Sequence, residues 1–270
     1  MRSKLVSLAA AVVVAFATLV CVDAQPAPPR LPRDLNEWTV EYSIVGGRWP
    51  RRHSVSLTSA GGLVGTDTDA GHHVTARVSD DVVAKATSLL KRAQPAKPDP
   101  PSPDKPRLGL VLDTGGRTYD LEPTSDITKI LDEAFDGAVA AGVIGEWRQS
   151  GWKLCKPVPQ VNLEKIDPPI DPLIFKSDGT FSVTWLERPT ITEAPHVQGA
   201  DYTGHYTLNP SPSQGYIQMS IDGGRFVPVD FSGRGGFGLA DGALTIRNAW
   251  FGTKRVKPKP NICELTFAKK

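Results

Sequence analysis

The chain has 270 residues, of which 40% are hydrophobic and 22% are charged, so it is large enough for one large or two small folded domains. Its formal net charge of +2 is too small to predict binding to nucleic acid or to an anionic membrane surface. The 24 prolines gather in a few stretches, which indicates linkers and loops rather than disorder throughout.

The first 24 residues have the pattern of a secretory signal peptide. Arg2 and Lys4 precede an apolar run over Leu5–Val20, and Val22–Ala24 offers a cleavage site. A retained membrane anchor and lipidation at Cys21 are the alternatives. We therefore expect an exported bacterial protein, secreted or periplasmic, whose mature chain has no transmembrane segment. A Pro-rich leader is expected over residues 25–36.

Residues 37–150 are expected to form an α+β domain, with an antiparallel sheet and two helices on one of its faces. Alternating apolar and polar residues predict strands at Trp38–Val45, His53–Ser59, Leu63–Val64, His73–Val78, Arg107–Leu112 and Thr118–Leu121. Amphipathic helices are expected after Ser79 and from Thr124 or Ser125 to Gly142. The stretch Gln94–Pro106, with six prolines in thirteen residues, reads as a surface loop of this domain.

The first domain resembles the emfourin family, on the residues Val40–Gly47, Val78–Asp80 and Pro106–Leu121. The resemblance covers roughly Glu37–Ala141. Emfourins are small bacterial proteins that inhibit thermolysin-like metalloproteases, so it implies a protease inhibitor whose partner is a secreted metalloprotease. The chain departs from the family where Phe-Ala-Gly usually follows the glycine pair, because Arg48-Trp49-Pro50 stands there.

The turn after the first strand is the candidate partner-binding edge. Trp49 stands between arginines, and aromatic and arginine side chains dominate the binding energy of protein interfaces. The alternative is that Trp49 packs on its own domain. The predicted partner-binding residues are Gly46, Gly47, Arg48, Trp49, Arg51 and Arg52.

Residues 151–270 are expected to form an all-β, barrel-like domain, after a junction at Val143–Gly151. Strands are predicted at Leu173–Phe175, Thr180–Leu186, Tyr202–Leu208, Tyr216–Ile221, Arg225–Phe231, Gly236–Leu239, Ala243–Ala249 and Ile262–Phe267. Short strands at such regular spacing, separated by turn residues and not by helices, are typical of a sandwich or a barrel.

This second half resembles the lipocalin-like and META-type small barrels of bacterial envelope proteins. The resemblance rests on Gly151–Leu154, Ile174–Phe181, Tyr202–Tyr206 and Cys263–Phe267. It implies, as the alternative function, an envelope protein that binds a small apolar ligand in the barrel or acts as a scaffold.

Two cysteines remain once the signal peptide is removed, Cys155 and Cys263. Because an exported protein meets an oxidising compartment, we predict a disulfide between them, closing a loop of about 108 residues. Two free buried thiols are the alternative. Their places in the opening and closing segments suggest that the two ends of the barrel meet.

The sequence contains none of the common catalytic or phosphate-binding motifs. His72 and His73 read as surface loop histidines, and Asp67 and Asp69 offer too few ligands for calcium. The glycines of Gly233–Gly238 predict a bent strand. We therefore expect no catalytic residues, no metal and no cofactor, and hence a binding protein; a hydrolase is the third hypothesis.

Overall fold

The computed structural model describes residues 31–32, 34–46, 51–97, 105–155, 169–186, 200–210, 215–253 and 262–270. The expected signal peptide (1–24), most of the leader (25–36) and the predicted contact residues Gly47, Arg48 and Trp49 lie outside the described residues. The part of the chain that the structure describes is mostly β, with fourteen strands and two helices.

The first six strands form an open antiparallel sheet in the order β4-β3-β2-β1-β5-β6. They are β1 (Trp38–Gly46), β2 (Arg51–Thr58), β3 (Gly62–Asp67), β4 (His72–Arg77), β5 (Arg107–Thr114) and β6 (Arg117–Asp120). All six predicted strands of this part are therefore confirmed, with their ends shifted.

The two faces of this sheet differ because successive residues of a strand point to opposite sides. The inner face is apolar and buried, and includes Val40, Tyr42, Val55, Leu57, Leu63, Leu110 and Leu112. The outer face carries small hydroxyl side chains that are half-buried or exposed, among them Thr39, Ser43, Ser54, Ser56, Thr58, Thr66, Thr75 and Thr118. An antiparallel sheet with one solvated face produces this alternation.

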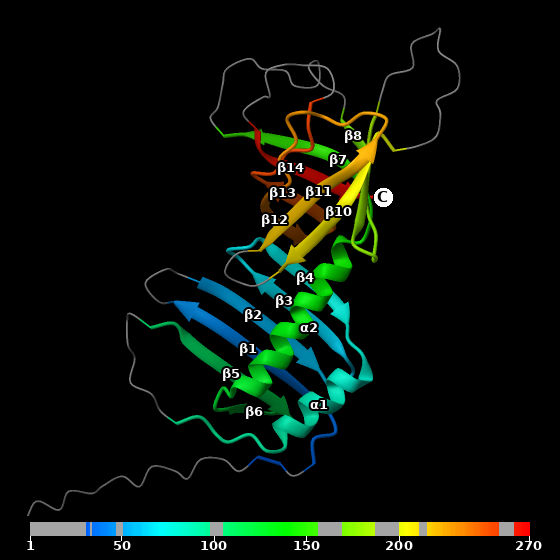
Figure 1. The fold of residues 1–270 in the computed structure, drawn as a ribbon. Helices are drawn as coiled ribbons and strands as arrows, with labels where there is room; N and C mark the ends of the chain where they lie inside the picture. The colour runs from blue at the N-terminus through cyan, green and yellow to red at the C-terminus, as the bar shows by residue number, and fades with distance from the viewer. Residues whose placement is uncertain are drawn as a thin grey trace, which may run out of the picture.

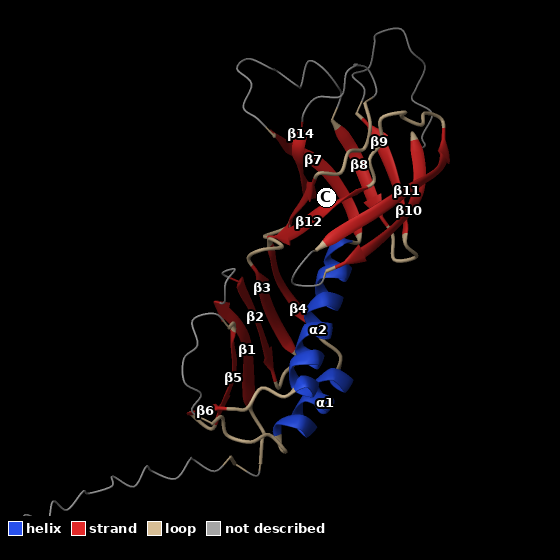
Figure 2. Ribbon diagram, turned by 60° about the vertical axis from the view of Figure 1, so that its left-hand side comes forward, coloured by secondary structure: helices blue, strands red, loops and turns tan. Residues whose placement is uncertain are grey.

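Two helices, α1 (Asp80–Leu90) and α2 (Ser125–Val143), lie against the inner face, as Figures 1 and 2 show. Both predicted helices are confirmed, although the Ser79 side chain makes no capping hydrogen bond. Helix α2 buries a residue once per turn: Ile127, Leu131, Phe135, Val139 and Val143. The Phe135 ring fits because Gly65 lies beneath it; a Cβ at Gly65 would be 2.2 Å from a ring carbon.

The remaining strands form a closed antiparallel barrel in which each strand pairs with the next in the chain and β14 pairs with β7. They are β7 (Gly145–Leu154), β8 (Ile170–Phe175), β9 (Thr180–Trp185), β10 (Tyr202–Asn209), β11 (Tyr216–Gly224), β12 (Arg234–Ala240), β13 (Ala243–Arg247) and β14 (Ile262–Lys269). The predicted β-barrel is confirmed.

Glycines let β12 lie close to both of its neighbours, β11 and β13. A Cβ on Gly233, just before β12, would lie 2.0 Å from the Met219 carbonyl oxygen of β11. Ile217 pairs with Gly235 and Tyr216 with Gly236. A Cβ on Gly235 would lie 2.1 Å from the Arg247 carbonyl oxygen, so a side chain there would push β13 away. The glycine run is thus part of a strand where neighbouring backbones approach closely.

Two predictions about single segments are wrong. Val143–Gly151 is not a junction, because β7 begins at Gly145 and pairs with both β8 and β14. Arg225–Phe231 is not a strand but a loop between β11 and β12. Pro228 lies within this segment and has no N–H to give to a ladder.

Cys155 and Cys263 form the predicted disulfide, with their Cα atoms 4.8 Å apart. It joins the end of β7 to the start of β14, so the first and last strands of the barrel are linked covalently as well as by hydrogen bonds. Within the described residues, neither helix is long and apolar enough to span a bilayer.

Candidate functional site

The predicted contact edge lies at one corner of the open sheet, where β1 turns into β2. Gly46 ends β1 with a φ of 86°, in the left-handed region that glycine favours, and pairs with Arg51. Arg52 follows on β2 opposite Val45. The structure therefore places Gly46, Arg51 and Arg52 side by side at this corner.

On the outer face of this corner, an exposed valine lies between two arginines. Val45 pairs with Arg52 of β2 on one side and with Arg107 of β5 on the other. Residues opposite each other in antiparallel strands share a face, so the three side chains form one row. Val45 is 52% exposed, and both arginines are exposed. No carboxylate of the described residues forms an ion pair with either arginine.

The inner face of the same corner is also uncovered. Leu108 pairs with Ile44 and is 52% exposed, whereas Leu110, two residues further along β5, is 2% exposed. We call Val45, Arg52, Arg107 and Leu108 the basic–apolar corner. Arg107 and Leu108 were not among the predicted contact residues, because only strand pairing brings β5 beside the β1–β2 turn.

A second cluster lies inside the molecule, between the sheet and α2. His53 of β2 is 1% exposed and sits between two carboxylates from different elements. Its Nε2 lies 2.9 Å from Asp132 Oδ1 on α2, and its Nδ1 lies 3.4 Å from Asp67 Oδ2 on β3. The imidazole therefore ties two strands to the helix. We call His53, Asp67, Asp132 and Asp136 the histidine cluster.

The carboxylates keep His53 protonated. Burial disfavours the imidazolium, but the hydrogen bonds and negative charges of Asp132 and Asp67 outweigh burial and raise the pKa of His53 to about 9. Asp67 is 0% exposed and its Oδ1 accepts the Ala70 N–H at 2.9 Å, so it also shapes the β3–β4 turn. The imidazolium is thus charge-paired on both sides, by a hydrogen bond to Asp132 and by a longer ion pair with Asp67.

Asp136 lies one helical turn beyond Asp132 and behaves differently. Burial, followed by the nearby charge of Asp132, raises the pKa of the Asp136 carboxyl to about 6, against an opposing contribution from His53. Perturbed groups of this kind mark functional sites in many enzymes. Here, however, the imidazole has no exposed surface, so it cannot meet a substrate in this conformation.

His72 is buried and not on a surface loop, which corrects the prediction from sequence. It lies on β4 and is 1% exposed, while its neighbour His73 is exposed on the outer face. His72 Nδ1 accepts the backbone N–H of Leu239 in the barrel at 3.1 Å. In the described residues, no three His, Cys, Asp or Glu side chains are grouped so as to hold a metal ion.

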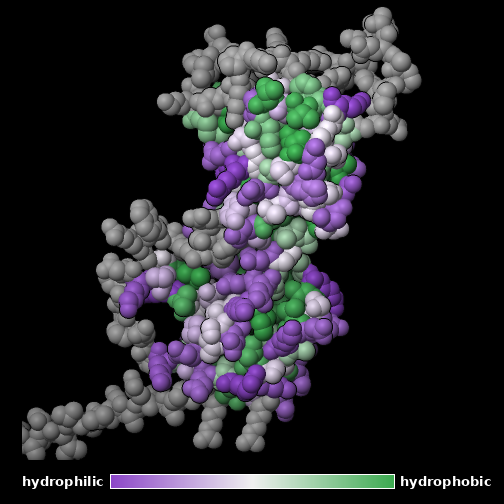
Figure 3. Space-filling model, viewed as in Figure 1, coloured by the Kyte–Doolittle hydropathy of each residue, from purple (hydrophilic) through white to green (hydrophobic). Residues whose placement is uncertain are grey.

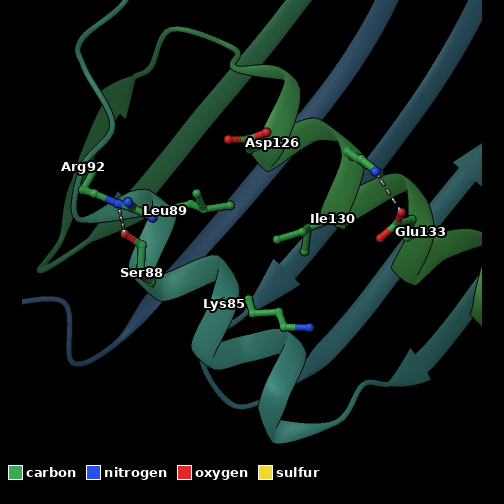
Figure 4. A pocket seen from close by; sticks show the side chains of 8 residues that line it. Lys85, Ser88, Leu89, Arg92, Asp126, Ile130 and Glu133 are labelled. Carbon is green, nitrogen blue, oxygen red and sulfur yellow. Dashed lines mark hydrogen bonds and ion pairs between the residues drawn. The ribbon is translucent and has the colours of Figure 1, made fainter.

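A shallow groove of about 380 Å³ runs between α1 and α2 (Figure 4). Half-buried Leu89 and Ile130 lie at its floor. Lys85 and Arg92 line the α1 side, and Asp126 and the Lys129–Glu133 ion pair line the α2 side, with 3.8 Å between Lys129 Nζ and Glu133 Oε1. Exposed charged side chains contribute little binding energy, so we do not expect the groove to bind a ligand tightly.

The barrel interior is filled by large side chains. Those with at most 1% exposure include Trp147, Phe175, Phe181, Tyr202, Phe237, Phe251 and Phe267. At the barrel end away from the helices, by contrast, Leu186, Val227 and Val229 are 43%, 49% and 88% exposed. Figure 3 shows hydrophobic side chains gathered in the upper part of the barrel. We call Leu186, Val227 and Val229 the barrel rim.

No protein-family model, curated protein or solved structure matches the chain.

The histidine cluster was missed from the sequence, although one signal was present. His53 alternates with Val55 and Leu57, and Asp67 with Leu63, so both polar residues occupy the apolar face of their strands. A polar residue in that position has to find a buried partner. Which partner it finds depends on α2, because Asp132 is 79 residues from His53.

Proposed function

We propose that the chain is an exported binding protein that inhibits a thermolysin-like metalloprotease through the β1–β2 turn and the basic–apolar corner beside it. The observation that carries the proposal is the row Arg52, Val45 and Arg107 on three neighbouring strands. Arginine beside apolar side chains is the composition enriched at protein interfaces. The predicted contact residue Trp49 belongs to the same turn in the sequence.

The order of elements adds support. The emfourin resemblance implies an α+β domain with a strand, a glycine turn, a second strand, a helix, two strands and a closing helix. The described residues follow the order β1 to β4, α1, β5, β6 and α2. We take the part of the predicted 37–150 domain that precedes β7, residues 37–143, as that domain, with the basic–apolar corner as its contact edge.

The disulfide supports the exported location. Disulfides persist in oxidising compartments and are rare in the bacterial cytoplasm. The Cys155–Cys263 bond links strands at the two ends of the barrel sequence, where it limits the freedom of the unfolded chain. Together with the signal sequence, it favours a secreted or periplasmic protein.

The test is inhibition of thermolysin by the purified chain of residues 25–270. We expect inhibition at or below micromolar concentration. Val45→Glu should weaken inhibition at least tenfold, because it places a charge at the centre of the row. The control is Val64→Glu, since Val64 is 45% exposed on the same outer face but lies on β3, away from the corner.

No inhibition by the full chain would refute the protease target. Equal losses from Val45→Glu and Val64→Glu, with both variants folded by circular dichroism, would instead remove the corner from the contact surface. Trp49→Ala gives an independent check on the turn, because the proposal predicts that it lowers potency while the protein stays folded.

A second candidate function is the binding of a small apolar ligand by the barrel. The exposed apolar barrel rim favours it, because solvent-exposed valines and leucine at a barrel end are a surface that an apolar compound can cover. A long-chain fatty acid is the probe. Thermal stabilisation by the fatty acid that is lost in Val227→Ser/Val229→Ser and kept in Val45→Glu would support the barrel as the binding part.

A further inference from the structure

The open sheet and the barrel meet at a joint formed by β4 on one side and β12 and β13 on the other. Gly142 of α2 also packs against Leu239 of β12 there. Ala240 of β12 makes a single parallel pair with His73 of β4. The Leu239 N–H donates to His72 Nδ1 at 3.1 Å, and Arg247 Nη2 donates to the Ala70 carbonyl oxygen at 2.5 Å. His72 therefore stands at the centre of the joint.

The hydrogen bond from Leu239 fixes the protonation state of His72. A ring nitrogen that accepts an N–H cannot carry a proton itself, so Nδ1 is bare and the imidazole is neutral with its proton on Nε2. Nε2 is buried and has no hydrogen-bond partner in the described residues. Gly215 lies close to this side of the ring, because a Cβ on Gly215 would be only 3.0 Å from Nε2.

The surroundings of His72 oppose a second proton. Burial is the largest cause, Asp67 of β3 favours the charged form, and Arg247 of β13 disfavours it, so the pKa of His72 is lowered to about 4. The neighbouring rings, Phe237 at 4.9 Å and Phe135 at 6.2 Å between centroids, offer no oxygen or nitrogen acceptor for an N–H. A protonated His72 would thus be an imidazolium facing a peptide N–H and a guanidinium.

We propose that His72 makes the joint between the open sheet and the barrel sensitive to acid, because its protonation breaks the Leu239 hydrogen bond and releases β12 from β4. The open sheet and its helices stay folded meanwhile. The histidine cluster holds them together with an imidazolium that is already protonated, so the same acid adds no charge at His53.

The direction follows from linkage. In the open joint His72 has its ordinary pKa of 6.5, and in the closed joint its pKa is about 4, so acid favours opening between these two values. The opening equilibrium should rise on the order of 100-fold between about pH 7.5 and about pH 4.5. Above about pH 7 it should not depend on pH.

The experiment is hydrogen exchange of single amides in the full chain, followed by NMR from about pH 7.5 to 4.5. The protection factor of the Leu239 amide, corrected for intrinsic exchange, should fall on the order of 100-fold. The amides of Val40 in β1 and Leu131 in α2 should lose much less. In His72→Gln, which can accept the same hydrogen bond but cannot be protonated, the fall at Leu239 should disappear.

The matched control is His73→Gln, the neighbouring histidine on the outer face, whose Nδ1 lies 3.0 Å from Thr66 Oγ1. It should keep the acid response in full. A constant Leu239 protection factor, an equal fall in His72→Gln, or an equal loss at Val40 and Leu131 would each overturn the proposal.

A second measurement needs no variant and covers the case in which His72→Gln fails to fold. The imidazole nitrogen shifts of His72 in the unaltered chain should report a proton on Nε2 at neutral pH. They should change together with Leu239 protection as the pH falls. A proton on Nδ1 at neutral pH would overturn the proposal outright.

Discussion

The open sheet and the barrel both bury apolar side chains, but different interactions hold their strands and helices together. The barrel closes on itself, through hydrogen bonds between β14 and β7 and the Cys155–Cys263 bond. The open sheet cannot close, and its inner face is covered by helices (Figure 2). There an imidazolium between carboxylates of β3 and α2 joins the layers.

The two halves should therefore be destabilised by different treatments. The barrel's large interior side chains are aromatic, and its buried carboxylate Asp201 lies near the barrel rim with Arg225 at 3.5 Å. Its stability should depend on packing and on the covalent link. The sheet layer carries its ionisable groups at its centre, so its stability should depend on protonation.

The largest effect is expected from removing the disulfide. Cys155→Ser/Cys263→Ser frees a loop with a sequence separation of 108, and the chain-entropy model assigns such a loop about 4–5 kcal/mol. Denaturant unfolding should show a loss near this size. Hydrogen exchange should place it in the barrel strands and spare α2. Reduction of the unaltered chain with dithiothreitol is the matched treatment, and a uniform loss of protection over both halves would contradict the comparison.

Alkali should weaken the sheet layer first. The pKa of His53 is raised from 6.5 to about 9 in the folded protein, so its contribution is complete below 6.5 and is lost as the pH rises through about 9. The loss should be at most about 3 kcal/mol. Amide exchange in α2, measured from about pH 6.5 to 10 and corrected for intrinsic rates, should rise more than in β9.

His53→Gln is the control for this alkaline effect, because glutamine has no proton to lose and its profile should be flat over the same range. The titration of Asp136 does not overlap with this alkaline effect. Its pKa is raised to about 6, so the stability that its neutral form contributes is lost between about 3.8 and 6, below the window of His53.

A smaller loss is expected from Asp67→Asn, which removes one of the two charges that hold His53. Asparagine can still accept the Ala70 N–H, so the β3–β4 turn should survive. The contact between Asp67 Oδ2 and His53 Nδ1 is an ion pair at 3.4 Å, and leaving the buried His53 N–H without that charge should cost about 1–3 kcal/mol. Urea unfolding at neutral pH measures this loss of stability. The control is Asp69→Asn, because Asp69 is an exposed carboxylate of the same turn. Equal stabilities of the two variants would show that Asp67 does not help to hold the layer.

Much of the fold could be predicted from local patterns. Strict alternation marked β1, and the once-per-turn stripe marked α2. Strand β7 was missed because Trp147 is its only fully buried residue, so its pattern has no regular alternation. The segment Arg225–Phe231 was mistaken for a strand because apolar residues recur in it, although Pro228 interrupts any ladder.

The sites depend on tertiary contacts that local patterns do not contain. The β1–β2 turn stood out through its own composition, whereas Arg107 joins the corner only through the pairing of β5 with β1. His72 and Leu239 are 167 residues apart, so their hydrogen bond follows from how the two halves meet.

The smallest effect on stability, and the sharpest test of function, comes from the basic–apolar corner. Arg52→Ala/Arg107→Ala should change the free energy of unfolding by less than about 0.5 kcal/mol, because both side chains are exposed and form no ion pair with another described residue. Thermolysin inhibition should nevertheless weaken about tenfold or more, and more at low salt than at high salt.

The control is Arg77→Ala, which should leave inhibition unchanged. Arg77 is an exposed arginine on the same outer face, at the end of β4. If the double variant inhibits as well as the unaltered chain does, the arginines lie outside the contact. These two arginines of the outer face would then contribute neither to inhibition nor to the stability of the open sheet.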